Sequence, residues 1–357
     1  MNQRILSLCI GIGLFTGTTD AQLQRIVLQG AGTPQIFTDL SAALAASQPN
    51  DKLYLSGGNF QVTGNLVIDR PLHFIGAGIH PDSSSVTSTT TITVDPVGTT
   101  GDIVITSGAS GSTFTGLVLA PYYYIQYGTG LADDDPTDLL FQRCRFLSRT
   151  ITYFNVTVPS ASSTVFDECI FNRHINGYIG GSGTFTRCIL DYQTGTSSAI
   201  NGFGILSIDH CVFLDVEAFR NSPNATMENS ICTDTNYPVY QSNNITLTNC
   251  IFSGTTYTGN SSGAVVVNCA LNVPVASIFI NETDLNYQFT DDLHLTPGSG
   301  GIGGADDGTD IGIYGSGTPY KPGAVPYNPH FRSAVIAPAT NANGDLPVNI
   351  RVAAQTN

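Results

Sequence analysis

Four polar residues in the middle of the chain are of types that can hydrolyse a glycosidic bond. They are Arg173, His174, Asp191 and Asp215. If neighbouring structural units bring Asp191 and Asp215 to about 5 Å from each other, the pair has the separation of a retaining glycosidase. A nearby Arg or His then acts as a base or holds the substrate. The alternative interpretation is structural, because turns favour Asp residues that bond to the backbone.

A group of tyrosines offers a second kind of site, one for carbohydrate. Tyr122, Tyr123, Tyr124 and Tyr127 lie in one short segment, and such rigid, amphipathic rings stack well on sugars. Alternation along a strand places Tyr122 and Tyr124 on one face and Tyr123 on the other. Part of the set can therefore belong to the core instead.

Acidic residues just after these tyrosines carry oxygen atoms of the kind that bind calcium. The segment contains Asp133, Asp134, Asp135 and Asp138. A solvated acidic loop is the interpretation we prefer. We therefore predict no metal site and no cofactor, with calcium as the alternative.

Composition restricts both the fold and the partners. The chain has 357 residues, with 13 Lys and Arg against 27 Asp and Glu, and a net charge of −14. This acidity argues against nucleic acid or an anionic membrane surface as the main partner. Strand and turn residues dominate, and only 2 Met and no Trp are present, so an all-helical fold is excluded.

The amino terminus has the features of an export signal. Arg4 precedes an apolar run at residues 5–15, and the small residues Thr19 and Ala21 stand at positions −3 and −1 of a cleavage site before Gln22. The apolar run is too short to span a bilayer. We expect residues 1–21 to be removed, leaving a secreted or cell-surface protein that does not insert into the membrane.

A repeat of about 20 residues organises the rest of the chain. Seven segments align on one small residue, here called position 0, which is Cys144, Cys169, Cys188, Cys211, Ser230, Cys250 and Cys269. Apolar residues recur at positions −3 and +2. A period near 20 without a helical pattern predicts a β-solenoid, in which stacked units share one core. Positions 0 and +2 share a strand face, whereas the odd step from −3 to 0 requires a bend at position −1.

Three columns of the repeat permit more than one interpretation. Position 0 is predicted to hold buried free thiols rather than disulfides, because thiols in register point in parallel. At position −1, Asn229, Asn249 and Asn268 suit a left-handed bend. The earlier members of that column read as a surface ladder of ion pairs of small energy, with catalysis as the alternative; they are Arg143, Glu168, Arg187 and His210.

Position +1 is the third of these columns, and it should point outward although it is apolar. Its members include Ile170, Ile189, Val212, Ile231 and Ile251. Such a stripe is covered by a loop, forms a partner surface, or only reflects the preference of β-branched residues for strands.

These repeats resemble those of the pectin-lyase-like superfamily. Residues 51–78 resemble its first coils, and the tail at 307–315 resembles the ends of secreted bacterial members. The resemblance implies an all-β fold, a single-stranded right-handed parallel β-helix over residues 22–315. A short helix at 42–46 would form its amino-terminal cap. The prolines spread over residues 316–357 indicate an extended arm that folds back on the last coil, with a small separate module as the alternative.

The resemblance says less about activity, because the superfamily holds lyases, hydrolases, esterases, adhesins and non-catalytic proteins. The hydrolase pattern with Gly-His-Gly and Arg-x-Lys is absent, and Lys52 and Lys321 lie outside the regular coils. We therefore expect a monomeric bacterial protein that contacts polysaccharide or another surface protein without catalysis. The alternative is a polysaccharide lyase or glycoside hydrolase acting around Arg173, His174, Asp191 and Asp215.

Overall fold

The computed structural model describes most of the chain. The described residues are 24–81, 88–129, 135–147, 152–153, 162–177, 180–191, 198–321, 330–337 and 339–353. The predicted export signal, Asp133 and Asp134 lie outside them.

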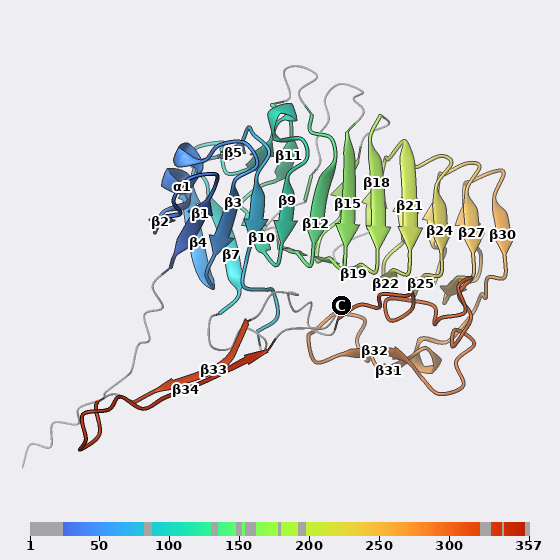
Figure 1. Ribbon diagram of the computed structural model, residues 1–357. Helices are drawn as coiled ribbons and strands as arrows, with labels where there is room; N and C mark the ends of the chain where they lie inside the picture. The colour runs from blue at the N-terminus through green and yellow to red at the C-terminus, as the bar shows by residue number, and fades with distance from the viewer. Residues whose placement is uncertain are drawn as a thin grey trace, which may run out of the picture.

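The described residues form a parallel β-solenoid of about 8 turns, with stacked coils over residues 52–267 (Figure 1). Its longest side, here called the long sheet, has the strand order β2 (Gln35–Phe37), β1 (Ile26–Gln29), β3 (Lys52–Leu55), β6 (His73–Ile75), β9 (Thr113–Thr115), β12 (Leu139–Gln142), β15 (Ser163–Asp167), β18 (Ser182–Thr186), β21 (Ile205–Asp209), β24 (Thr226–Glu228), β27 (Thr246–Thr248) and β30 (Val265–Val267).

Two further sides complete each coil. The second sheet runs in the order β4 (Gly58–Thr63), β7 (Thr90–Asp95), β10 (Val118–Pro121), β13 (Arg145–Phe146), β16 (Ile170–Phe171), β19 (Ile189–Asp191), β22 (Val212–Leu214), β25 (Ile231–Cys232) and β28 (Ile251–Phe252). The third side consists of β5 (Leu66–Ile68), β8 (Ile103–Ile105) and β11 (Ile125–Tyr127), followed by β14 (Thr152–Tyr153), β17 (Ile175–Asn176), β20 (Ile200–Asn201), β23 (Phe219–Arg220), β26 (Val239–Tyr240) and β29 (Thr258–Gly259).

The register of the strands confirms the alignment of the repeat. Phe141, Phe166 and Phe185 pair directly across β12, β15 and β18, and all three are buried. Their ring centroids are separated by 5.4 and 4.8 Å, in stacked geometry. The described cysteines are free thiols, and all except Cys269 are buried. The predicted core columns therefore form one continuous hydrophobic core.

The bend predicted at position −1 is also confirmed. Arg143, Glu168, Arg187 and His210 have φ between 50° and 53°, and Asn229 has φ 49°. A left-handed backbone costs a residue with a side chain roughly 1–2 kcal/mol. The stacked strands on both sides of the corner hold these residues in that conformation.

The amino-terminal end of the solenoid is closed. Helix α1 (Leu40–Ala46) is capped by Asp39, whose side chain accepts a hydrogen bond of 2.7 Å from the backbone N–H of Ala42. Leu40 and Ala43 are buried against the core. Strand β1 pairs antiparallel with both β2 and β3. The predicted cap is confirmed.

The outward apolar column at position +1 is covered by the chain itself. After β30, the chain passes through a short 3-10 helix, η2 (Val275–Ser277), and returns along the outer face of the second sheet as residues 278–321, here called the strap (Figure 1). The strap includes the antiparallel strands β31 (Phe279–Asn281) and β32 (Asp292–Leu295). One hydrophobic cluster joins the column to the strap; its members include Ile170, Ile189, Val212, Ile231, Ile251, Ile278, Leu293, Ile311, Ile313 and Tyr320.

The strap also changes the role of the column at position −1. Arg143 and Glu168 are 0% exposed and form a bidentate ion pair, with Nε–Oε2 and Nη2–Oε1 distances of 3.1 Å. Glu168 accepts a further hydrogen bond from the backbone N–H of Lys321, at 3.1 Å. The predicted surface ladder is therefore wrong for this pair, because the strap excludes water from the corner.

The carboxy-terminal residues form a separate hairpin. Strand β34 (Val348–Ala353) pairs antiparallel with β33 (His330–Ile336). In Figure 1 this hairpin extends away from the stacked coils instead of lying on the last coil.

Candidate functional site

The structure places Asp191 under the strap. This residue ends β19 and is 3% exposed. Its Oδ2 accepts hydrogen bonds from the backbone N–H of Tyr287, at 2.9 Å, and from Asn172 Nδ2, at 3.4 Å. Burial raises the pKa of Asp191 to about 6, and the nearby carboxylate of Glu282 acts in the same direction. Asp191 thus fastens the strap to the second sheet.

Asp215 lies in a different environment. The register pairs Asp191 with Leu214, and Asp215 follows one residue later. It is exposed, has φ 48°, and its backbone N–H donates to Thr233 Oγ1 at 2.8 Å. The structure therefore does not bring the two carboxylates to one register position. An offset of one residue turns a side chain to the other face of a strand.

Arg173 and His174 follow β16, in the coil that precedes β19. Arg173 is half-buried, and His174 is buried. Burial, together with the charge of Arg173, lowers the pKa of His174. Both effects favour the uncharged imidazole.

The tyrosines fall into two groups. Tyr122, Tyr123 and Tyr124 are half-buried at the corner after β10, where the rings of Tyr122 and Tyr123 meet edge to face at 4.6 Å. Tyr122 also lines a hollow of about 260 Å³ with Thr93, Val94, Asp95, Ala120, Pro121 and Leu147. Tyr127 is buried instead, and its hydroxyl lies 2.6 Å from Thr164 Oγ1. Its ring packs in the core and has no face open to a sugar.

The acidic segment after the tyrosines is described only in part. Asp135 is buried. Asp138 has φ 55°, and its Oδ1 accepts a hydrogen bond of 3.1 Å from Ser163 Oγ. Within the described ranges, no group of three or more His, Cys, Asp or Glu side chains is placed to hold a metal ion.

The outer face of the long sheet, here called the open face, carries two rows of mostly polar side chains, which end at Val265 and Val267 on β30. The strand register aligns each row from coil to coil. The first row contains His73, Thr113, Leu140, Val165, Thr184, Ser207, Thr226 and Thr246. The second row contains Ile75, Thr115, Gln142, Asp167, Thr186, Asp209, Glu228 and Thr248. Most of these side chains are half-buried, which leaves their outer ends accessible.

The open face also carries three carboxylates that were not among the sites predicted from the sequence, namely Asp167, Asp209 and Glu228. Asp167 accepts hydrogen bonds from Arg187 and, at 3.0 Å, from Gln142 Nε2. Asp209 and Glu228 are direct neighbours across β21 and β24. All three occupy position −2, one residue before the bend. The signal was present in the repeat, because position −2 lies on the opposite strand face from the buried position −3.

The two neighbouring carboxylates have opposite pKa shifts. Burial alone would raise the pKa of Asp209, but hydrogen bonds from His210 and Asn229, at 2.8 and 2.9 Å, outweigh it and hold this pKa below its usual value. For Glu228, burial and the charges of Asp306 and Asp209 raise the pKa. The pair therefore combines a carboxylate that stays ionised with one that keeps its proton more readily.

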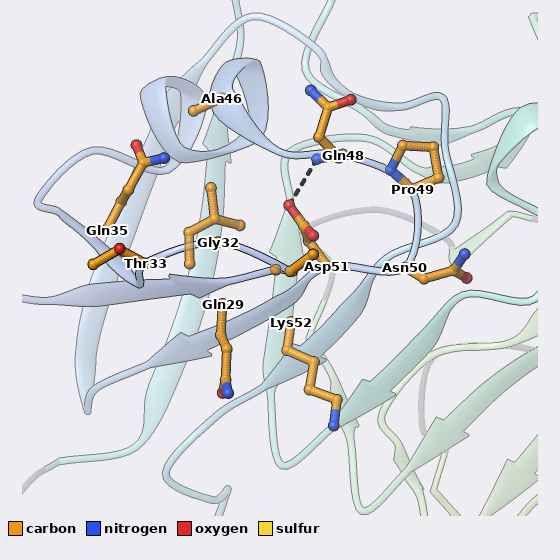
Figure 2. A pocket seen from close by; sticks show the side chains of 13 residues that line it. Gln29, Gly32, Thr33, Gln35, Ala46, Gln48, Pro49, Asn50, Asp51 and Lys52 are labelled. Atoms are coloured by element: carbon orange, nitrogen blue, oxygen red, sulfur yellow. Dashed lines mark hydrogen bonds between the residues drawn. The ribbon is translucent and has the colours of Figure 1, made fainter.

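A further pocket lies at the amino-terminal cap, beside the first strand of the open face (Figure 2). It has a volume of about 580 Å³ and is lined by Leu28, Gln29, Gly30, Ala31, Gly32, Thr33, Gln35, Ala46, Gln48, Pro49, Asn50, Asp51 and Lys52. Asp51 accepts a hydrogen bond of 2.8 Å from the backbone N–H of Gln48, which fixes one wall. A Cβ on Gly30 would lie 2.3 Å from Asp51 Oδ1, so glycine is required there. Side-chain amides both donate and accept hydrogen bonds, which suits a hydroxyl-rich ligand.

No protein-family model matches the chain, and no curated protein matches its sequence. Across the described residues, no helix is long and apolar enough to cross a membrane.

Proposed function

We propose that this protein is a non-catalytic, exported β-helix protein that binds polysaccharide along the open face. One observation carries the proposal. The outer face of the second sheet is covered by the strap, whereas the open face keeps two rows of mostly polar, half-buried side chains in register. A surface of this kind has the groups that a polymer of sugars needs.

The chemistry of the rows suits a repeating ligand. Serine and threonine hydroxyls both donate and accept hydrogen bonds, as sugar hydroxyls do. Neighbouring strands lie about 4.8 Å apart, so a chain lying across the strands meets a hydroxyl at successive coils wherever the row carries Ser or Thr. Thr184, Ser207, Thr226 and Thr246 provide four consecutive hydroxyls in one row. Tyr122, Tyr123 and Tyr124 lie at the corner between the second sheet and the third side, so they would form a separate contact away from the open face.

Charge narrows the class of polymer. The chain has a net charge of −14, and Asp167, Asp209 and Glu228 lie on the open face itself. These charges repel polyuronates and other acidic polymers. We therefore propose a neutral polysaccharide as the ligand.

Export, membership of a superfamily and bacterial origin are proposed from features of the sequence. The run after Arg4 and the small residues before Gln22 support export and a location outside the cell. Residues 51–78 and 307–315 support membership of the pectin-lyase-like superfamily and a bacterial origin. These features agree with a role at a polysaccharide-rich surface.

The test is a panel of neutral and acidic polysaccharides presented to the purified protein in affinity electrophoresis. The proposal predicts retardation by at least one neutral polymer and none by polyuronates. Reducing ends are measured in the same mixtures, and none should be released. Absence of retardation by every polymer would reject polysaccharide binding and leave a surface protein as the partner to search for.

A second function has one specific observation in its favour. Asp209 and Glu228 are neighbours on adjacent strands, and their pKa values are shifted in opposite directions, as expected for the nucleophile and the acid of a glycoside hydrolase. Release of reducing ends that is lost in Glu228→Gln would support this alternative. Loss in Asp191→Asn, with the fold intact, would instead support the site predicted around Asp191 and Asp215.

A further inference from the structure

Among the described residues, the core is less completely covered at the carboxy-terminal end of the solenoid than at its other end. In the last coil, Val266, Cys269 and Leu271 occupy the three core positions of the repeat, yet each is only partly buried. The equivalent residues one coil earlier are Leu247, Cys250 and Phe252, and all are buried. The strap leaves this end and runs along the second sheet, so part of the core remains open to solvent.

The last strand of the long sheet is an edge. β30 pairs with β27 on one side, and within the described part of the chain no strand pairs with its other side. Val265 and Val267 on this strand are 55% and 43% exposed. Proteins usually protect such an edge with Lys, Pro or a bulge. β30 consists of three valines and contains none of these.

This end is also uncharged. Residues 235–281 contain no Asp, Glu, Lys, Arg or His, although the whole chain has a net charge of −14. Two copies of such an acidic protein repel each other over most of their surfaces. The last coils are therefore the part of the solenoid where two copies approach with the least repulsion.

The opposite end is a poorer match for this end. Its outermost strand, β2, pairs with β1 and has no second neighbour among the described strands, but α1 covers the core there. A head-to-tail contact would therefore leave the open core against a capped end, whereas the same end of a second copy supplies a second open core. Contacts between identical surfaces form about a two-fold axis.

We propose that two copies of this chain associate end to end, with β30 of one copy pairing antiparallel with β30 of the other. The pairing satisfies the free backbone groups of both edges. It covers Val266, Cys269 and Leu271 of each copy and joins the two cores. The proposal departs from the monomer expected from the sequence, and it does not depend on the proposed polysaccharide binding.

Sedimentation velocity over a range of protein concentrations tests the proposal. The expected result is a shift from one to two chain masses as the concentration rises. Val265→Lys combined with Val267→Lys places like charges across the two-fold axis and should keep the protein monomeric. Ile205→Lys is the matched control, because Ile205 is 69% exposed on the same sheet but far from its edge. This control should dimerise like the wild type.

Cys269 gives a second measurement on the unmodified protein. The other six thiols in the described residues are buried, so a maleimide reagent should label Cys269 first. Dimerisation should slow this labelling at high protein concentration, by about the fraction of chains that are paired. One chain mass at every concentration with constant labelling overturns the proposal. A dimer that persists in the double Lys variant, shown by circular dichroism to be folded, also overturns it.

Discussion

The two broad outer faces of the solenoid are built from the same kind of strand and have different surroundings. On the second sheet, the outward column consists of Ile and Val side chains, and the strap buries it. On the long sheet, the outward rows are mostly Thr, Ser and acidic residues, and they stay accessible. The core residues of the two sheets are alike, but the residues that point outward differ. The outward residues therefore determine which face the strap covers and which face stays open to a partner.

The corner between these faces should give the largest effect. Glu168→Ala leaves the buried guanidinium of Arg143 without its counter-charge, which costs about 3–5 kcal/mol in comparable buried pairs. The exposed pair Arg70–Asp69 is the control, and Asp69→Asn should change the free energy of unfolding by at most about 1 kcal/mol. Urea titrations measure both. If Glu168→Ala lowers the free energy of unfolding as little as Asp69→Asn does, water reaches the corner and the strap is only loosely attached.

A pair of isoleucines compares the two faces directly. Ile231 is buried between the second sheet and the strap, so Ile231→Ala should destabilise the fold by about 2–5 kcal/mol. Ile205 is exposed on the open face, so Ile205→Ala should change stability by no more than about 0.5 kcal/mol. The measurement is the midpoint of denaturant unfolding. Equal effects would contradict the distinction between a covered and an open face.

The attachment of the strap should also respond to pH. The pKa of Asp191 is about 6 in the folded protein, above its value of about 3.9 in an unfolded chain. Between these values the folded state binds more protons, so this group lowers stability as the pH rises from about 4 to about 6.

Asp191→Asn removes this titration and keeps an oxygen that can accept from the Tyr287 N–H. It should flatten the slope and stabilise the protein by about 1–2 kcal/mol at pH 7. Glu217, whose pKa burial raises to about 7, retains its own slope. Thermal unfolding at several pH values measures the difference. A variant with an unchanged slope would mean that Asp191 is solvated.

The stacked coils could be predicted because their core residues recur in every repeat. The covering of the second sheet by the strap could not be predicted in this way. The core positions recur every coil, so Phe141, Phe166 and Phe185 could be aligned from the sequence alone. The strap has no repeat, and its contacts join distant residues, as in the bond from the Lys321 N–H to Glu168. Burial of the Arg143–Glu168 pair therefore could not be inferred from its own coil.

Predicting the candidate site from the sequence was limited in a second way. A shift of one residue along a strand changes which side chains are neighbours on the next strand. Asp191 and Asp215 differ by one position in the repeat, and the register pairs Asp191 with Leu214 instead. Asp209 and Glu228 share position −2 and are true neighbours. Because they share a column of the repeat, the alignment of the coils is sufficient to predict that this pair lies side by side.

The most direct test of the account is the affinity of the bound neutral polysaccharide for two charge-matched variants. Ser207→Arg places a large side chain at the centre of the open face, and Ile302→Arg places the same group on the strap, where Ile302 is 50% exposed. If the open face binds the polymer, Ser207→Arg should weaken binding at least tenfold, equivalent to about 1.4 kcal/mol, and Ile302→Arg should bind like the wild type. Unchanged binding by Ser207→Arg would contradict the assignment of the open face as the binding surface.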